Sequence, residues 1–353
     1  MPGLLGILLL AATVAACGTI GASSVTRDRT DYTEAISTSW KEQTLGNIMR
    51  LRYGDAPVFL DVSSLISQYQ LEGAVNASGT VFPGSGPNAV TMGAAGRYID
   101  RPTVTYTPVQ GDKFTKSLLR PIPPAALFQL VQAGYPIDLV FQLTVRAVNE
   151  VYNKSERAMM KREADPAFYA VLDALRRIQQ SESVGFRVER RGADDSALIL
   201  FRKAASPAVA ADQKFVRDTL NLDPTATDIT LTFGAIQRSN REVAMLSRSM
   251  LEILLEIGAS ASVPADHVKD GRAPPNPAVA AAGNPRDQPL VRIQSGLERP
   301  ETSFAATRYR DRWFWIDDRD LRSKSIFTFL MMLFSLSETG VAQQAPVITI
   351  PVN

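Results

Sequence analysis

The sequence has little of the residues on which metal and thiol chemistry depends. Its 353 residues include one cysteine, Cys17, and one histidine, His267. A single cysteine excludes an intrachain disulfide, and the two counts together exclude Cys/His zinc sites, haem-attachment motifs and Cys–His catalysis. His267 stands in the proline-rich stretch VPADHVKDGRAPPNP without a nucleophile elbow, so we expect it to be a solvent-facing loop residue. We expect no cofactor and no metal ion.

The chain also lacks an excess of charge of either sign. Its 38 basic and 36 acidic residues nearly balance, which leaves no strong field to attract nucleic acid. The basic residues are scattered, and no run of them is interleaved with aromatic residues. The glycines of FPGSGPNAV are not followed by the lysine and Ser/Thr of a phosphate-binding loop. We expect no nucleic-acid partner.

Long apolar runs are scarce, and the first one lies at the start of the chain. Residues 4–16 form a run of the length of a signal-peptide core, too short for a spanning helix of about 20 residues. The run ends in Val14-Ala15-Ala16-Cys17, which resembles the lipobox of bacterial lipoproteins. In that family the cysteine sulfur receives a diacylglycerol, the peptide is cut before the cysteine, and the new amine is acylated. The alternatives are an ordinary cleaved signal and a buried core cysteine.

The lipobox resemblance implies a location. Residues 1–16 would be the signal peptide, Cys17 the lipidated residue, and residues 17–30, which are small and polar, a flexible tether. Gly18 after the cysteine favours export to the outer membrane by resemblance to enteric lipoproteins. Several acyl chains, at about 0.8 kcal/mol per buried methylene, would hold the protein firmly on the bilayer. We expect a lipid anchor on the periplasm-facing side of the outer membrane.

The hydrophobic pattern predicts an α+β fold of repeated β-hairpin–helix units, preceded by an N-terminal region of a helix plus strands. The N-terminal region comprises a helix over 31–53, strands within 56–79 and 102–109 around a long hairpin loop, two short helices within 110–134, and a strand over 137–153. Hairpins are predicted over 184–201, 228–246 and 304–317, each followed by a helix, over 212–220, 249–257 and 321–336. A terminal strand is expected over 345–353.

These elements suggest an order of domains along the chain. We expect an N-terminal α+β region at 31–160, a hairpin–helix domain at 161–258, and a C-terminal hairpin–helix–strand unit at 291–353. Between the last two, residues 259–290 are rich in proline and alanine, which predicts an exposed linker or insertion.

The stretch RYRDRWFWIDDRDLRSKSIFTFLMMLF contains the densest group of candidate catalytic residues. Asp317, Asp318 and Asp320 fit a carboxylate cluster for acid–base work or a cation, but acidic residues before a helix also satisfy its free amides, and we favour that role. Trp313 and Trp315 alternate with apolar neighbours, so at least one aromatic face is expected to pack inward. The adjacent Ser323-Lys324 pair would point about 100° apart on a helix, which argues against a Ser–Lys dyad.

Three further stretches, LRYGDAPVFLDV, PIPPAALFQLVQAGYPID and RWFWIDDRDLRSKS, resemble a group of Gram-negative envelope lipoproteins for which no activity is established. The resemblance supports the location and implies no mechanism. We expect a binding, scaffold or assembly component with an envelope protein partner, and no enzyme. The alternatives are a carboxylate-dependent envelope hydrolase, with Asp317 and Asp318 as first candidates, and a carrier of an apolar ligand. A cleft with converging carboxylates would favour the hydrolase, an exposed apolar patch the assembly component, and a closed apolar cavity the carrier.

Overall fold

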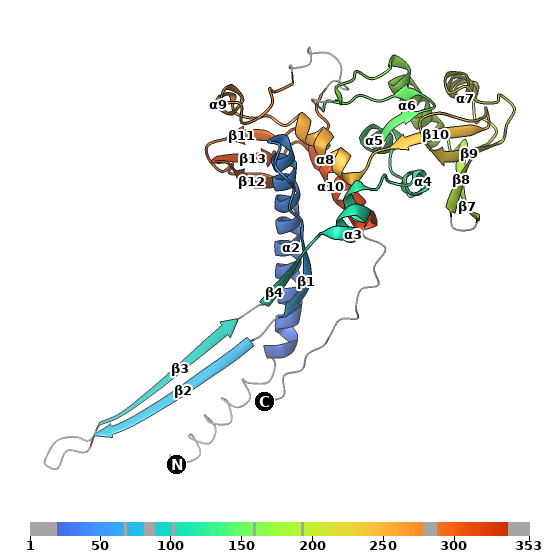
Figure 1. The fold of residues 1–353 in the computed structure, drawn as a ribbon. Coiled ribbons are helices and arrows are strands. Elements are labelled where there is room, and N and C mark those ends of the chain that lie inside the picture. Colours follow the sequence, from blue (N-terminus) through green and yellow to red (C-terminus); the bar gives the residue numbers. More distant parts are fainter. Residues whose placement is uncertain are drawn as a thin grey trace. The chain divides into compact units, whose positions relative to one another are not determined.

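The computed structural model describes residues 20–66, 69–80, 89–100, 103–157, 160–191, 194–277 and 288–337 (Figure 1). The chain forms two compact units: unit 1 comprises Met1–Pro57 and Asp112–Asn353, and unit 2 comprises Val58–Gly111. Helices and strands are both abundant, and the predicted α+β class is confirmed. The signal peptide, Cys17 and the terminal strand predicted over 345–353 lie outside the described residues.

The first described element of unit 1 is α2, Ile20–Arg52, which contains the helix predicted over 31–53. The flexible tether predicted over 17–30 is wrong from residue 20 onward, because those residues are helical. Among the helix residues from 29 onward, whose burial is described, the C-terminal part enters the core, where Leu45, Ile48 and Met49 are fully buried. The packing against α8 (Met250–Ala259) is close: a Cβ atom on Gly258 would lie 3.1 Å from the main-chain oxygen of Ile48. Gly54 follows the helix with a φ of 77°, a backbone conformation that favours glycine and ends the helix as predicted.

The larger sheet of unit 1 has the strand order β6-β5-β10-β9-β8-β7. Its strands, in chain order, are β5 Val145–Val148, β6 Val151–Tyr152, β7 Val184–Arg191, β8 Asp194–Phe201, β9 Asp228–Phe233 and β10 Glu242–Ser247. Strands β7 and β8 form the first predicted hairpin. The second predicted hairpin is wrong, because β9 and β10 run parallel, with Thr230 beside Glu242. Alternation of apolar and polar residues is the same in both directions, so the pattern did not reveal the strand direction.

Six helical elements precede or connect the strands of this sheet. They are α3 Gly111–Phe114, the π-helix η1 Thr115–Leu119, α4 Pro124–Gln132, α5 Ile137–Thr144, α6 Pro166–Gln180 and α7 Pro207–Thr219. Among them, α4, α5 and α6 contact the strands of the sheet. The two short helices predicted within 110–134 are confirmed. The single strand predicted over 137–153 is wrong. In its first half, α5 buries Ile137, Val140 and Phe141 on one side, and its second half consists of the two short antiparallel strands β5 and β6. In α5 the three- and four-residue spacing outweighs the β-branched composition.

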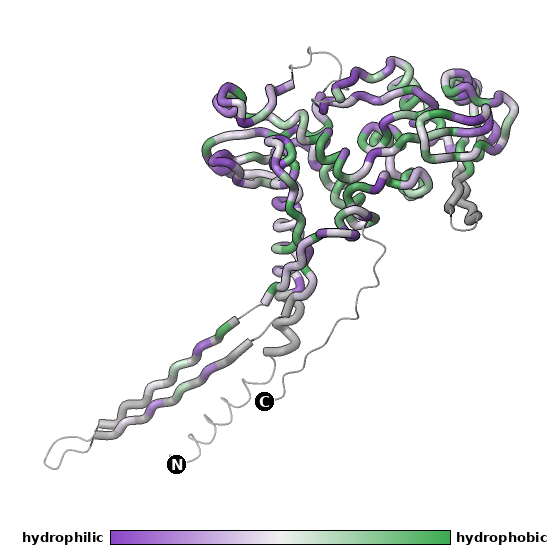
Figure 2. The backbone as a smooth tube through the Cα atoms, in the orientation of Figure 1, coloured by the Kyte–Doolittle hydropathy of each residue, from purple (hydrophilic) through white to green (hydrophobic). Residues whose placement is uncertain are grey.

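The C-terminal part of unit 1 is a second, three-stranded sheet of order β11-β13-β12 followed by α10. The elements are β11 Gln294–Gly296, β12 Ala305–Tyr309, β13 Arg312–Ile316 and α10 Leu321–Ser337. The third predicted hairpin is confirmed, with Arg310 and Asp311 at positive φ in its turn. Phe314 and Ile316 are the inward residues of β13 and are fully buried. Hydrophobic residues, green in Figure 2, gather along α8 and α10.

Unit 2 consists of two antiparallel strand pairs. Strand β1, Leu60–Ile66, pairs with β4, Thr103–Pro108, and β2, Tyr69–Thr80, pairs with β3, Ala89–Asp100. The β2–β3 pair, called the ribbon below, keeps a continuous register from Tyr69 beside Asp100 to Thr80 beside Ala89. The predicted hairpin loop lies outside the described residues. Within the described part of the chain, no helix is both long and apolar enough to cross a membrane.

Candidate functional site

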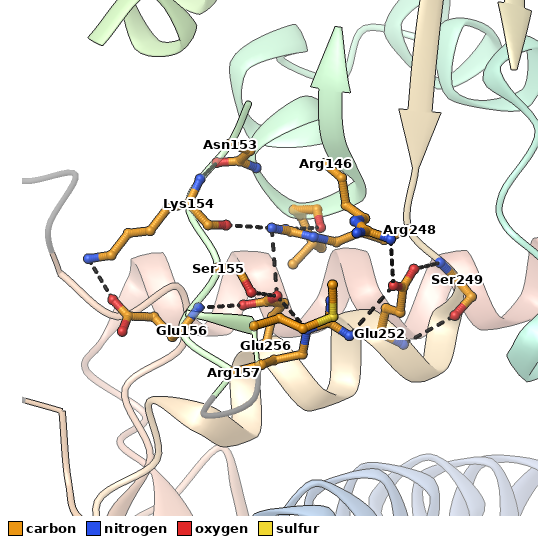
Figure 3. Close-up of polar contacts among 12 residues, drawn as sticks. Arg146, Asn153, Lys154, Ser155, Glu156, Arg157, Arg248, Ser249, Glu252 and Glu256 are labelled. Atoms are coloured by element: carbon orange, nitrogen blue, oxygen red, sulfur yellow. Dashed lines mark hydrogen bonds and ion pairs between the residues drawn. The ribbon is translucent and has the colours of Figure 1, made fainter. Parts of the chain in front are cut away.

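A group of charged residues, two of them buried, surrounds the start of α8 (Figure 3). Its members are Arg146, Arg157, Arg248, Glu252 and Glu256, called the charged cluster below. The helix begins with a capping box, in which the Ser249 side chain and Glu252 satisfy each other's backbone amides. Glu256 lies one turn further along, so both carboxylates are on the same face of α8.

Arg248 is the most deeply buried member, with 2% of its surface exposed. Its Nη1 donates to the main-chain oxygens of Gln142 at 3.1 Å and Leu143 at 2.9 Å, at the C-terminal end of α5, where the helix dipole favours a cation. Its Nη2 donates to the oxygen of Lys154 at 2.7 Å. Burial lowers the pKa of Arg248, yet a guanidinium stays charged at neutral pH. Arg248 therefore joins α5 to the segment after β6.

Glu256 fixes the same segment from the other side. Its carboxylate accepts hydrogen bonds from the Ser155 hydroxyl at 2.6 Å and the Glu156 amide at 2.9 Å, and Arg157 Nε lies 3.0 Å away (Figure 3). Glu252 is paired in turn with Arg157 at 3.5 Å and with a second arginine at 3.3 Å. Both carboxylates are thus engaged by cations and donors of the protein. This arrangement suits a structural clamp better than acid–base catalysis, which needs a carboxyl group open to substrate.

His267 forms a second polar group, at the end of α2. It lies in α9, Ala265–Lys269, and its Nδ1 is 2.7 Å from the hydroxyl oxygen of Tyr53. Only 2% of its surface is exposed, so the expected solvent-facing loop histidine is wrong. Burial lowers the pKa of His267 and raises that of Tyr53, so both side chains are neutral at pH 7. A buried neutral histidine bonded to a tyrosine serves packing and offers no route to substrate.

Arg52 explains why the stretch around His267 is packed. Its Nε donates to the oxygen of Ala261 at 3.2 Å, and its Nη2 donates to the oxygens of Pro274 at 3.0 Å and Pro275 at 2.9 Å. Ala261, Val263 and Ala273 are buried as well. The first part of the segment predicted to be an exposed linker is therefore held against α2, and residues 278–287 lie outside the described residues.

The three aspartates singled out in the sequence do not converge on one point. Asp320 accepts hydrogen bonds from the Ser323 amide at 3.1 Å and the Ser323 hydroxyl at 2.8 Å, which is the helix-capping role expected for it. Asp318 pairs with Lys324 at 2.7 Å, and Asp317 accepts from the amide of the residue two positions later. Ser323 and Lys324 thus have different partners, as the argument against a dyad predicts. In the described part of the chain, no group of three potential metal ligands comes together.

An apolar cavity lies in unit 1 beside the larger sheet. Its volume is about 30 Å³, and its lining is entirely apolar, including Phe128, Phe141, Val216 and Met245. That volume is enough for about two water molecules, whereas pockets for small-molecule ligands measure about 300 Å³ or more. The cavity gives no support to the carrier alternative.

Unit 2 exposes apolar side chains that the sequence analysis did not single out. The exposed apolar patch comprises Val58, Leu60, Val62, Val104 and Tyr106, which are between 37% and 52% exposed. Val62 and Tyr106 are cross-strand neighbours, so the patch includes adjoining side chains of β1 and β4. Every residue of β4 is exposed. The alternation in PTVTYTPV was a usable signal, but it does not indicate whether the apolar side of a strand is covered.

Comparison with known proteins assigns no function. No family model, curated protein or solved structure matches the chain. Membership of the lipoprotein group suggested by the sequence therefore stays a prediction, and the function has to be argued from the residues of the chain itself.

Proposed function

We propose that the protein is a lipid-anchored component of the Gram-negative envelope that acts by binding and assembly. In this proposal the lipid on Cys17 holds it to the outer membrane facing the periplasm, and unit 2 contacts an envelope partner. The observation that carries the proposal is the exposed apolar patch on a unit built from strand pairs.

Unit 2 has little means of burying its own apolar residues. A two-stranded hairpin is marginally stable in water unless a further strand or a helix covers one face. Within the described residues, β1 pairs with β4 alone and β2 with β3 alone, so each strand also presents an open backbone edge. Open edges and adjoining exposed apolar side chains are features of surfaces that bind another chain.

The polar groups of unit 1 support the same choice. The carboxylates that a hydrolase would use, Asp317 and Asp318, are engaged by a backbone amide and by Lys324. The charged cluster and the Tyr53–His267 pair connect elements of the fold. These contacts hold the elements of unit 1 together and leave no carboxylate of these groups free for substrate.

The test removes the ribbon and keeps the rest. Residues 67–102 are replaced by a short Gly-Ser turn, so that β1 and β4 can still pair, and the lipidated protein is cross-linked in membranes and sized in mild detergent. We expect the unaltered protein to run in a complex. The shortened protein keeps the exposed apolar patch and loses the open edges of the ribbon, so it should run in a weaker complex with unchanged helical circular dichroism. Tyr106→Ser should weaken the complex, whereas Thr105→Ser, at the neighbouring position of β4, should not. A complex unchanged by both the deletion and Tyr106→Ser would refute the proposal.

A further inference from the structure

The ribbon is unusual in its charge. Residues 73–96 contain no Asp, Glu, Lys, Arg or His, in a chain of which 21% of residues are charged. The charges of the ribbon lie at its base, where Glu72 and Arg97 stand opposite each other in the register and Asp100 follows. A hairpin surrounded by water does not need a long stretch without charged residues. A hairpin that enters an apolar phase does need one, because burying an unpaired charge there is costly.

The register divides the ribbon into two sets of positions. One set includes Glu72, Ala74, Asn76 and Ser78 on β2, which are all exposed. Apart from Glu72, which stands opposite Arg97, these residues are small and uncharged. The positions between them are paired as Leu71 with Tyr98, Gly73 with Gly96, Val75 with Ala94, Ala77 with Met92, and Gly79 with Val90. From the Leu71–Tyr98 pair to the Gly79–Val90 pair, all of this second set are apolar residues or glycine, and Asp100 stands on the same side at the charged base. Because successive positions of a strand belong to opposite faces, the ribbon beyond its base has one apolar face and one face of small and polar residues, while Ile99 lies on the polar side at the base.

The length of the charge-free part of the strands is close to the thickness of a bilayer. Each strand of the ribbon has 12 residues, and the part beyond the charged base, 73–80 or 89–96, extends over about 26 Å at roughly 3.3 Å per residue. The hydrocarbon core of a bilayer is about 30 Å thick and takes a strand of about 9–11 residues. We propose that the ribbon inserts into a phospholipid bilayer, with its apolar face against lipid and its open edges paired with the ribbons of other copies of this chain.

The pairing between copies follows from the backbone. Hydrocarbon offers no hydrogen-bond partner for unpaired amide and carbonyl groups, so an inserted two-stranded ribbon must find partners for both edges. The ribbons of other copies supply strands of equal length and of the same apolar–polar alternation. The inference rests on the proposed function, because the ribbon belongs to the unit proposed to bind a partner and the lipid on Cys17 would hold several copies at one membrane surface.

The test uses single-cysteine labelling of the full lipidated chain. Cys17 is the only cysteine of the chain, and in the proposed function it carries the lipid, so that an added cysteine would be the only free thiol. Met92→Cys and Thr91→Cys occupy neighbouring positions of opposite faces, and Thr302→Cys, on the exposed surface of unit 1, is the control. Each receives an environment-sensitive fluorophore, and the protein is reconstituted in phosphatidylethanolamine–phosphatidylglycerol vesicles. We expect the label at position 92 to shift to shorter wavelength and to be quenched by spin-labelled acyl chains, while the other two remain in water.

A matched pair of substitutions tests the face. Ala77→Lys places a charge on the apolar face, and Ser78→Lys places the same charge on the exposed position next to it. Ala77→Lys should abolish the wavelength shift at position 92 and the cross-linked oligomers in vesicles, whereas Ser78→Lys should leave both. Both lysines are added to the same strand, so a general failure of the ribbon to form would affect the two variants alike. Equal loss of the wavelength shift in Ala77→Lys and Ser78→Lys would therefore overturn the assignment of faces.

The outcomes separate this inference from the proposed function. One outcome is that the labels at 91 and 92 both stay in water while deletion of the ribbon still weakens the complex. In that case the ribbon binds a protein at the membrane surface, and insertion into the bilayer is refuted. A shift of both labels without quenching by lipid means that protein covers both faces, which also refutes it. If deletion of the ribbon leaves the complex unchanged, the proposed function is refuted. Insertion is then judged only by the wavelength shift and the lipid quenching of the labels at positions 91 and 92.

Discussion

The charged cluster allows a quantitative test of what holds unit 1 together. We predict that Arg248→Met strongly destabilises the fold. The guanidinium is 2% exposed and donates to three main-chain oxygens, those of Gln142, Leu143 and Lys154. Methionine roughly fills the space of the aliphatic stem but supplies no donor, so the three carbonyl groups lose a charged partner. Removing one member of a buried ion pair costs about 3–5 kcal/mol.

The expected loss in the free energy of unfolding for Arg248→Met lies at the lower end of that range. Glu256 is 4.0 Å from Arg248 and keeps Arg157 at 3.0 Å and the Ser155 hydroxyl at 2.6 Å, so its charge is not left without partners. We therefore expect a loss of about 3 kcal/mol. Arg146→Met is the control, because Arg146 is 32% exposed in its side chain and makes a single ion pair at 3.3 Å. Its loss should stay below about 1 kcal/mol.

Urea unfolding followed by tryptophan fluorescence measures the difference. All three tryptophans, Trp40, Trp313 and Trp315, belong to unit 1, so the signal reports on the unit that contains the cluster. With a slope of about 3 kcal/mol per molar, Arg248→Met should lower the midpoint by about 1 M, and Arg146→Met by less than about 0.3 M. Equal midpoints for the two variants would show that the buried arginine does not clamp α5 and α8 as described.

Four other outcomes follow from the packing and the sequence. Between pH 7 and pH 5.5 the free energy of unfolding should fall as pH decreases, because burial lowers the pKa of His267 and the unfolded chain binds the proton first; His267→Gln should flatten this dependence in chemical denaturation. Phe314→Ala should cost about 3–5 kcal/mol and Trp315→Ala less, since only the former side chain is fully buried; melting temperatures in the reverse order would contradict the assigned inward face. Arg52→Ala should speed tryptic cleavage at Lys269 and Arg272, whereas Arg50→Ala should not; equal rates would mean that the proline carbonyls need no arginine. Cys17→Ser should abolish labelling with a fatty acid and leave the folded body unchanged, and equal label in both proteins would disprove the anchor.

The elements that the sequence predicted well are those whose pattern is local. The turn at Arg310 and Asp311, the capping residue Asp320 and the helix end at Gly54 all depend on neighbours within a few positions. The parallel pairing of β9 with β10 and the helix α5 were missed for a different reason. Strand direction and the choice between helix and strand in a short apolar run are decided by what packs against them, and that information is distant in the chain.

The buried histidine shows the physical limit of arguments from composition. A proline-rich stretch is predicted to be exposed because its carbonyl groups have no amide partners nearby. The oxygens of Pro274 and Pro275 do find a partner, but it is Arg52, more than two hundred positions earlier. One guanidinium has five donors and can satisfy several carbonyl oxygens that a helix or strand would otherwise have to satisfy. Arg52, together with the Asn276 side chain that bonds the main chain of Val263, therefore holds this stretch, and His267 with it, in the packed interior. The partner of the proline carbonyls is distant in the chain, so no local pattern could reveal it.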